Sequence, residues 1–140
     1  MNKKLLKIQI DLDFVLIAVT SAQKDYRICY LINKYLSFNF ARVADLEVNI
    51  YQNSAEPVPF SMYEYYWEAS ETSFYLIANR GVDGLLIPEM READYFLMIK
   101  NYIDDQDLNN LISGLNRVPE IVAAIKIDPK KIKSRENLLF

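Results

Sequence analysis

The spacing of apolar residues shifts along the chain between the period of a strand and that of a helix. Apolar and polar residues alternate over 6–14, which predicts a first strand with one buried face. The dense apolar run 14–19 either continues this strand or forms a short buried segment of its own. From Lys24 onward apolar residues recur every three or four positions, which predicts an amphipathic helix capped by Ser21 or Asp25.

The middle of the chain has the pattern of strands joined by turns. Strands are predicted at 43–51, 62–69 and 73–80, where successive side chains fall on two faces, and the apolar run that opens at Tyr95 predicts a fourth at 95–101. The turn at 70–72 makes the second and third of them an antiparallel hairpin. The two prolines within 52–59 predict a loop, because proline fixes φ and removes a hydrogen-bond donor.

A charged turn separates the two apolar runs of segment 84–99. Pro88 interrupts a run that otherwise resembles a central strand, and proline cannot donate to a strand ladder. We therefore predict a wide hairpin. A tight turn at 79–84 leads into a short strand at 85–87 that ends at a sheet edge, and Tyr95 opens the next strand.

Acidic residues mark the start of a second helix. Asp104, Asp105 and Asp107 precede apolar residues at helical spacing, and their charge suits the positive end of a helix. We predict that this helix ends at Gly114 or Asn116.

The pattern after the second helix allows two interpretations. Residues 121–127 favour a last strand, and the alternative is a short helix that begins at Pro119. Strands linked by hairpins, with few helices, predict an α+β fold. We expect a single domain over residues 1–140, with a mainly antiparallel sheet of five to six strands and two helices packed on one face.

The composition fits a folded chain and excludes several kinds of chemistry. Hydrophobic residues make up 51% of the 140 positions, which suffices for one core, and histidine is absent. Histidine-based catalysis, histidine-ligated zinc and axial histidine on haem are thereby excluded. Cys29 is the only cysteine, so no disulfide forms within the chain, as is typical of the cytoplasm. We interpret Cys29 as a small core residue.

We assign no catalytic residue, no cofactor and no metal site. Solvent exposure explains Asp11 and Asp13 on one face of the predicted first strand, and capping explains the acidic start of the second helix. The three glycines cannot build a phosphate-binding loop at the spacing that such loops require.

The net charge and its distribution bear on the kind of partner. The formal charge is −3 and the pI is about 5.0, which repels phosphate backbones on average. Lysines gather near both ends of the chain, at 3–7 and 126–133, but basic ends are usually solvated. No apolar run approaches the length of a membrane span. We therefore expect neither nucleic acid nor a membrane as partner, and we expect a cytoplasmic location.

The charged turn is the first candidate site. Glu89 and Asp94 are suited to bind a cation, Arg91 a carboxylate or phosphate, and Tyr95 lies at the start of the following strand. The structural alternative, which we favour, is that these residues satisfy the backbone N–H groups of the turn and pair with one another.

The second candidate is an aromatic strand. Tyr63, Tyr65, Tyr66 and Trp67 place rings on both faces, and Tyr and Trp are common interface anchors. We predict that they contact a protein partner or a second copy in a homodimer. Base stacking is disfavoured because Glu64 and its acidic neighbours repel phosphate.

The charged turn also carries a family resemblance. Ile87-Pro88-Glu89, followed after three residues by Ala93-Asp94-Tyr95, resembles the motif of the bacterial IPExxxVDY family, with Ala93 in place of its valine. The start of the first helix at 25–29 and the tail 133–140 are also similar. The resemblance implies a single-domain bacterial protein of uncharacterised function, and it supplies no catalytic residues.

Two functional hypotheses follow from the sequence. The first is a non-enzymatic protein-interaction module that self-associates through the aromatic hairpin. The second is a small-ligand-binding protein or a histidine-free enzyme with its site at the turn between Pro88 and Tyr95.

Overall fold

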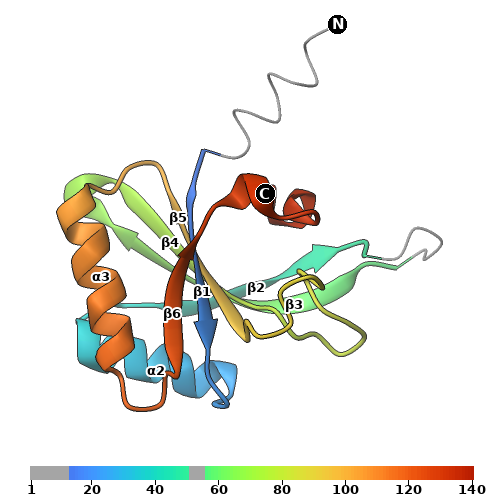
Figure 1. The fold of residues 1–140 in the computed structure, drawn as a ribbon, viewed down its shortest axis with the longest axis horizontal. Coiled ribbons are helices and arrows are strands. Elements are labelled where there is room, and N and C mark those ends of the chain that lie inside the picture. Colours follow the sequence, from blue (N-terminus) through green and yellow to red (C-terminus); the bar gives the residue numbers. More distant parts are fainter. Residues whose placement is uncertain (1–12, 51–55) are drawn as a thin grey trace, which may run out of the picture.

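The computed structural model describes residues 13–50 and 56–140, and its centre is a fully antiparallel sheet of six strands. The strand order is β2-β3-β4-β5-β1-β6, with two helices beside it (Figure 1). This architecture confirms the α+β class. The strands are β1 (Val15–Thr20), β2 (Ala41–Val48), β3 (Val58–Trp67), β4 (Thr72–Ala78), β5 (Tyr95–Lys100) and β6 (Ala123–Ile127); the helices are α2 (Asp25–Leu36) and α3 (Asp105–Arg117).

Both helices cover the same face of the sheet, as predicted. Their apolar stripes pack on the inward side chains of the central strands, including Ile17 of β1, Leu76 of β4 and Leu97 of β5. Ile32 of α2 and Leu115 of α3 are fully buried in this cluster. Burial of such a side chain contributes roughly 1.5–3 kcal/mol, so this layer holds much of the stability of the fold.

The opposite face of the sheet is covered by irregular chain. The loop at 79–94 supplies Leu86 and Ile87, and the C-terminal segment supplies Ile132 and Leu138, all buried against the sheet. Two short 3-10 helices, η2 (Pro129–Lys131) and η3 (Arg135–Leu138), lie in that C-terminal segment, and a third, η1 (Glu68–Ser70), connects β3 to β4.

The dense apolar run at 14–19 is explained by the cover on both faces of the sheet, with helices on one face and irregular chain on the other. β1 lies between β5 and β6 and has four buried residues in succession, so neither of its faces needs polar side chains. The run is therefore a strand. The predicted strand at 6–14 falls mostly on residues 1–12, which lie outside the described part of the chain.

The predicted strand at 85–87 is wrong. Leu85 forms only an isolated bridge with Arg80, and the chain then continues through turns to Tyr95. The cause is Asn79, which is fully buried. Its amide oxygen accepts from the Ile87 N–H at 2.7 Å, so that peptide group is not available to a strand partner.

The amide nitrogen of Asn79 closes the far end of the same loop. It donates to the carbonyl oxygens of Met90 at 3.0 Å and Ala93 at 2.8 Å. The backbone of Asn79 also accepts from the Leu86 N–H and donates to the Asp94 carbonyl. One buried side chain thus fixes the loop at 79–94 against the sheet.

Two predicted boundaries, the start of the first helix and the end of the first loop, differ from the structure. Lys24 is the N-cap of α2 and no side chain caps the helix, because Asp25 lies inside its first turn and Ser21 donates its hydroxyl to the Glu120 carbonyl. Val58 and Pro59 were predicted to lie in a loop but begin β3, where they pair with the edge strand β2. Proline is tolerated there because β3 pairs with β4 only from Met62 onward, so one side of β3 faces away from the ladder at Pro59.

The second helix begins as predicted but ends later. The Asp104 side chain accepts from the Asp107 N–H at 2.8 Å, which caps α3. The helix continues past Gly114 to Arg117. Gly114 lies where a side chain would approach Leu36 of α2, so its role is to allow close contact between the helices.

Asn116 has a different role at the end of α3. Its side chain donates to the Ala124 carbonyl and accepts from the Ala124 N–H, both at 2.9 Å. Ala124 lies in β6, which is the predicted last strand and not the alternative helix. The Asn116 amide therefore occupies backbone groups of an edge strand that another chain would otherwise be able to pair with.

Replacing Asn79 by Ala should destabilise the fold strongly. The Ile87 N–H and two buried carbonyls would lose their partners, which predicts a loss of about 3 kcal/mol in the free energy of unfolding. Urea denaturation of wild type and variant measures it. The exposed Asn109→Ala is the matched control, with an expected change within about 0.5 kcal/mol. Equal stabilities of the two variants would contradict the role of Asn79.

Candidate binding site

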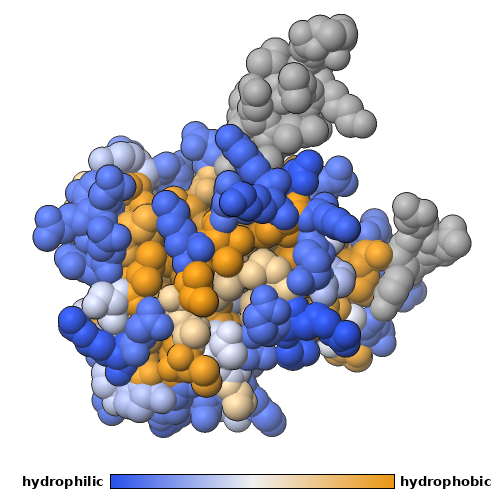
Figure 2. Space-filling view, viewed as in Figure 1, coloured by the Kyte–Doolittle hydropathy of each residue, from blue (hydrophilic) through white to orange (hydrophobic). Residues whose placement is uncertain are grey.

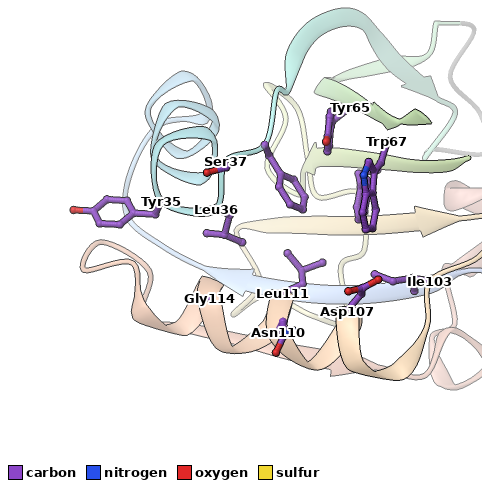
Figure 3. Close-up of a pocket in the computed structure, with 12 residues that line it drawn as sticks. Tyr35, Leu36, Ser37, Tyr65, Trp67, Ile103, Asp107, Asn110, Leu111 and Gly114 are labelled. Carbon is purple, nitrogen blue, oxygen red and sulfur yellow. The ribbon is translucent and has the colours of Figure 1, made fainter. Parts of the chain in front are cut away.

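An aromatic cavity opens between the two helices and the sheet. It has a volume of about 450 Å³, within the range of roughly 300–1,000 Å³ that is usual for binding pockets. Residues from both helices and both strands of the hairpin line it (Figure 3). They are Tyr35, Leu36, Ser37, Phe38, Tyr65, Trp67, Phe74, Ile103, Asp107, Asn110, Leu111 and Gly114.

The floor of the aromatic cavity is a cluster of packed rings. The rings of Tyr65 and Phe74 stack at 5.5 Å between centroids, and Phe38 packs at 4.9 Å from Tyr65 and 5.0 Å from Phe74. Phe40 joins the cluster, with its ring centroid 5.7 Å from that of Phe38. Ring pairs at these distances stabilise the fold by more than the burial of their apolar area alone. The rings therefore hold one another in place, and the floor is an apolar surface that exists before any partner binds.

Local sequence explains how these rings come together. The alternation of β3 places Tyr63, Tyr65 and Trp67 on the helix face, and Phe74 is the cross-strand partner of Tyr65 in β4. Ser37 ends α2 in the left-handed conformation, with φ of 58°. This turn directs the chain back toward the sheet, where the rings at 38 and 40 pack.

One end of the aromatic cavity combines a tryptophan with a carboxylate. Trp67 extends from β3 toward α3, where Asp107 and Ile103 line the same end of the cavity (Figure 3). Asp107, Asn110 and Gly114 are spaced by three or four residues and so lie on one face of α3. The other end is bordered by Tyr35, which is 50% exposed.

A second cavity, also of about 450 Å³, includes four charged residues in its lining, and we call it the polar cavity. It lies near the start of α2 and the loop at 79–84, and its charged lining residues are Lys24, Asp25, Asp45 and Arg80. The Asp25 carboxylate accepts from the Tyr63 hydroxyl at 3.0 Å and lies 3.5 Å from Arg42. Arg42 also pairs with Asp45, and Arg80 pairs with Asp94, so three of the four charged lining residues already have an ionic partner outside the lining.

The pKa values around Asp25 follow from these contacts. Burial acts to raise the pKa of Asp25, but hydrogen bonds from Ser61 and Tyr63 outweigh it and hold the pKa below its usual value. Burial and the neighbouring charges of Asp25 and Asp94 raise the pKa of Tyr95. Its hydroxyl stays protonated and donates to the Gln23 carbonyl at 2.5 Å. The arrangement thus joins β5 to the start of α2.

Glu89 binds the C-terminal segment. One of its carboxylate oxygens accepts from the Ser134 N–H at 2.6 Å and the other from the Ser134 hydroxyl at 2.9 Å. Burial acts to raise the pKa of Glu89, but these hydrogen bonds outweigh it and lower the pKa. A further bond runs from the Asn137 amide to the Leu86 carbonyl at 2.8 Å. The C-terminal segment is therefore bound to the loop at 79–94.

Asp94 binds in the opposite direction, toward β1. Its carboxylate accepts from the Ser21 N–H at 2.8 Å and pairs with the Arg80 guanidinium at 2.9 Å. The same Arg80 donates to the Arg91 carbonyl at 2.7 Å. Asp94 thus connects the turn after β1 with both ends of the loop.

The four residues predicted for the charged turn do not converge on one cavity. Glu89 contacts the C-terminal segment, Asp94 contacts Arg80, and Tyr95 borders the polar cavity. Arg91 lines a separate hollow of about 400 Å³ beside Pro88. Ligand binding by this set stays a prediction. Glu89 and Asp94 have structural contacts, but these join the turn to Ser134, Ser21 and Arg80, and the expected pairing of the four residues with one another is not observed.

The four predicted interface residues divide between the two faces of β3. Tyr63 is buried, with 6% exposure, and Tyr65 belongs to the ring cluster. Trp67 lines the aromatic cavity, and Tyr66, on the opposite face, is 50% exposed. A direct partner contact is therefore open to Tyr66 and Trp67.

The residues that complete the aromatic cavity were not predicted from the sequence. Phe38 falls outside the predicted elements, and Phe74 lies within the predicted strand at 73–80 with no role assigned to it. Of the lining residues on α3, Asp107 was interpreted as part of the capping start of the helix and Gly114 as one of two predicted ends. The pairing of Tyr65 with Phe74 follows from the hairpin register, so a signal existed, but the approach of α3 did not follow from the sequence.

A further apolar surface follows β6. Figure 2 shows an apolar stripe over the region of this strand. Val122, directly before β6, is 77% exposed, and Ile125, within it, is 59% exposed. Asn116 occupies the N–H and carbonyl of Ala124 at this edge. The exposed apolar side chains of the stripe are therefore accessible to a partner, but the backbone N–H and carbonyl of Ala124 are not.

Other candidate chemistries are limited within the described part of the chain. No group of three or more Cys, Asp or Glu side chains in 13–50 and 56–140 converges as metal ligands would. Cys29 is buried, and burial raises the pKa of its thiol, which fits the predicted core role. No helix among these residues has the length and apolar character needed to cross a membrane.

Comparison with protein-family models, curated proteins and solved structures finds no match for this chain. The resemblance to the IPExxxVDY family stays a prediction.

Replacing Glu89 by Gln should lower stability in a manner that depends on pH. The folded state lowers the pKa of Glu89, so its ionised form stabilises the fold above the unfolded pKa and this contribution is lost as the pH falls. We expect a loss of about 1 kcal/mol near neutral pH and no difference at about pH 3, measured by urea denaturation.

The exposed Glu92→Gln is the control for this experiment and should match wild type at both pH values. A Glu89→Gln effect of the same size at both pH values would show that the charge of Glu89 has no part in binding Ser134.

Proposed function

We propose that this chain is a protein-interaction module that receives apolar side chains of a partner in the aromatic cavity. The observation that carries the proposal is the preformed floor of stacked rings beneath an opening between α2, α3 and the β3–β4 hairpin. Aromatic residues dominate binding energy at interfaces because they bury large areas at low rotamer cost.

The chemistry of the lining supports binding more than catalysis. The lining is mainly aromatic and aliphatic, with a few polar groups such as Asp107 and Asn110 at the opening. Recognition sites have this character, in which apolar walls supply affinity and a few polar groups fix orientation. The exposed Tyr35 extends the apolar surface beyond the cavity, as a protein partner requires.

Self-association belongs to the same proposal, since a second copy is one such partner. Tyr66 and Trp67 are the predicted contacts that remain accessible for it.

Small-ligand binding is the second candidate function. It is supported by the polar cavity, where Tyr95 from the predicted turn lies with Lys24 and Arg80. The pairing of Asp25 with Tyr63 and Arg42 weakens this candidate, because a ligand would have to compete with existing contacts.

Selection of displayed random peptides against the immobilised protein tests the interaction function. We expect enriched peptides to bind wild type and to lose at least about tenfold in affinity on Asn110→Phe, which places a ring in the opening of the cavity. Fluorescence polarisation with the labelled peptides measures the affinities.

The matched control is Asn109→Phe, an exposed position on α3 outside the cavity lining, which should retain wild-type affinity. Failure to enrich any peptide, or peptides that bind wild type and Asn110→Phe equally, would contradict the proposed function.

A further inference from the structure

We infer that the partner segment received by the aromatic cavity is basic, with a lysine or arginine side chain seated between Trp67 and Asp107. This inference rests on the proposed function and names the chemistry of the partner. It follows from the charge at that end of the molecule, the unpaired carboxylate in the lining and the adjacent rings.

The end of the cavity near Trp67 is acidic. Segments 67–75 and 101–110 lie together there, since the Thr72 hydroxyl donates to the Tyr102 carbonyl and the Asn101 amide donates to the Glu71 carbonyl. Neither segment contains a lysine or arginine. Their carboxylates are Glu68, Glu71, Asp104, Asp105 and Asp107.

The nearest basic residue in sequence belongs to the other side of the sheet. The ammonium group of Lys100 lies 4.1 Å from the centre of the Phe140 ring and 5.4 Å from that of Tyr75, on the face that the C-terminal segment covers. It therefore does not neutralise the acidic end of the cavity.

Asp107 is half-buried in the cavity and has no cationic partner among the described residues. Its backbone N–H donates to the Asp104 side chain in the helix cap. Capping therefore does not involve the Asp107 carboxylate, which stays accessible to a cation. In contrast, Asp25 and Asp94 each pair with an arginine. A half-buried carboxylate gains most from a cation that arrives with the partner.

The rings beside Asp107 suit the same cation. The face of a tryptophan attracts an ammonium or guanidinium group, and the aliphatic stem of lysine or arginine packs on apolar surface. Trp67 would receive the charged end, and Tyr65 and Phe74 the stem or a neighbouring apolar side chain. A segment that combines basic and apolar residues fits both parts of the cavity.

The test uses the intrinsic fluorescence of Trp67, the only tryptophan of the chain. The probe is a nine-residue, tryptophan-free amidated peptide of alternating lysine and leucine, and its neutral counterpart has glutamine at each lysine position. We expect the lysine peptide to shift Trp67 emission and to bind at least about fivefold more tightly than the glutamine peptide at low salt.

The variant Asp107→Asn removes the charge and keeps the shape and the capping N–H. It should weaken the lysine peptide about fivefold and leave the glutamine peptide unchanged. Asp105→Asn, in the same helical turn and outside the cavity lining, is the control and should change either affinity less than twofold.

Three outcomes would overturn the inference. Equal binding of both peptides at Trp67 would show an apolar site without preference for a cation, and the proposed function would stand. No change in Trp67 fluorescence with either peptide would contradict binding of a basic segment in the cavity. The peptide-display selection would then test the proposed interaction function separately. Peptide affinity that falls as protein concentration rises would identify a second copy as the occupant.

Discussion

The buried amide of Asn79 is the interaction on which the second layer of this fold depends. The central strands of this sheet have apolar side chains on both faces, and the helices cover only one of them. The other is supplied by a loop with little regular structure, whose peptide groups find partners on one side chain. Glu89 then binds the C-terminal segment to this loop, and Asp94 binds the loop to β1.

This arrangement assigns different roles to the two sides of the sheet. The charged turn holds irregular segments in place, and its polar side chains bind mainly within the chain. On the helix side, the rings of Phe38, Tyr65 and Phe74 form a floor that the helices leave open between them. The surface with unused binding capacity is therefore on the face opposite the conspicuous motif.

The fold was largely predictable because its elements have clear periods. The alternation around Tyr65 gave the faces of β3 correctly, and the acidic start at Asp104 located α3. The strand at 85–87 was predicted wrongly because three apolar residues in a row fit a strand as well as a loop that packs on a sheet. The sequence does not reveal that Asn79 binds the Ile87 peptide group, since such contacts depend on tertiary structure. The aromatic cavity was missed for the same reason.

Native-state amide hydrogen exchange at Ile87 tests the central claim most directly. The Ile87 N–H donates to a fully buried side chain in an irregular loop, so the account predicts that it exchanges only when the whole protein unfolds. Its opening free energy should then equal the free energy of unfolding from urea denaturation. An opening free energy several kcal/mol lower, like that of an exposed loop, would show that the loop opens independently and would contradict the account.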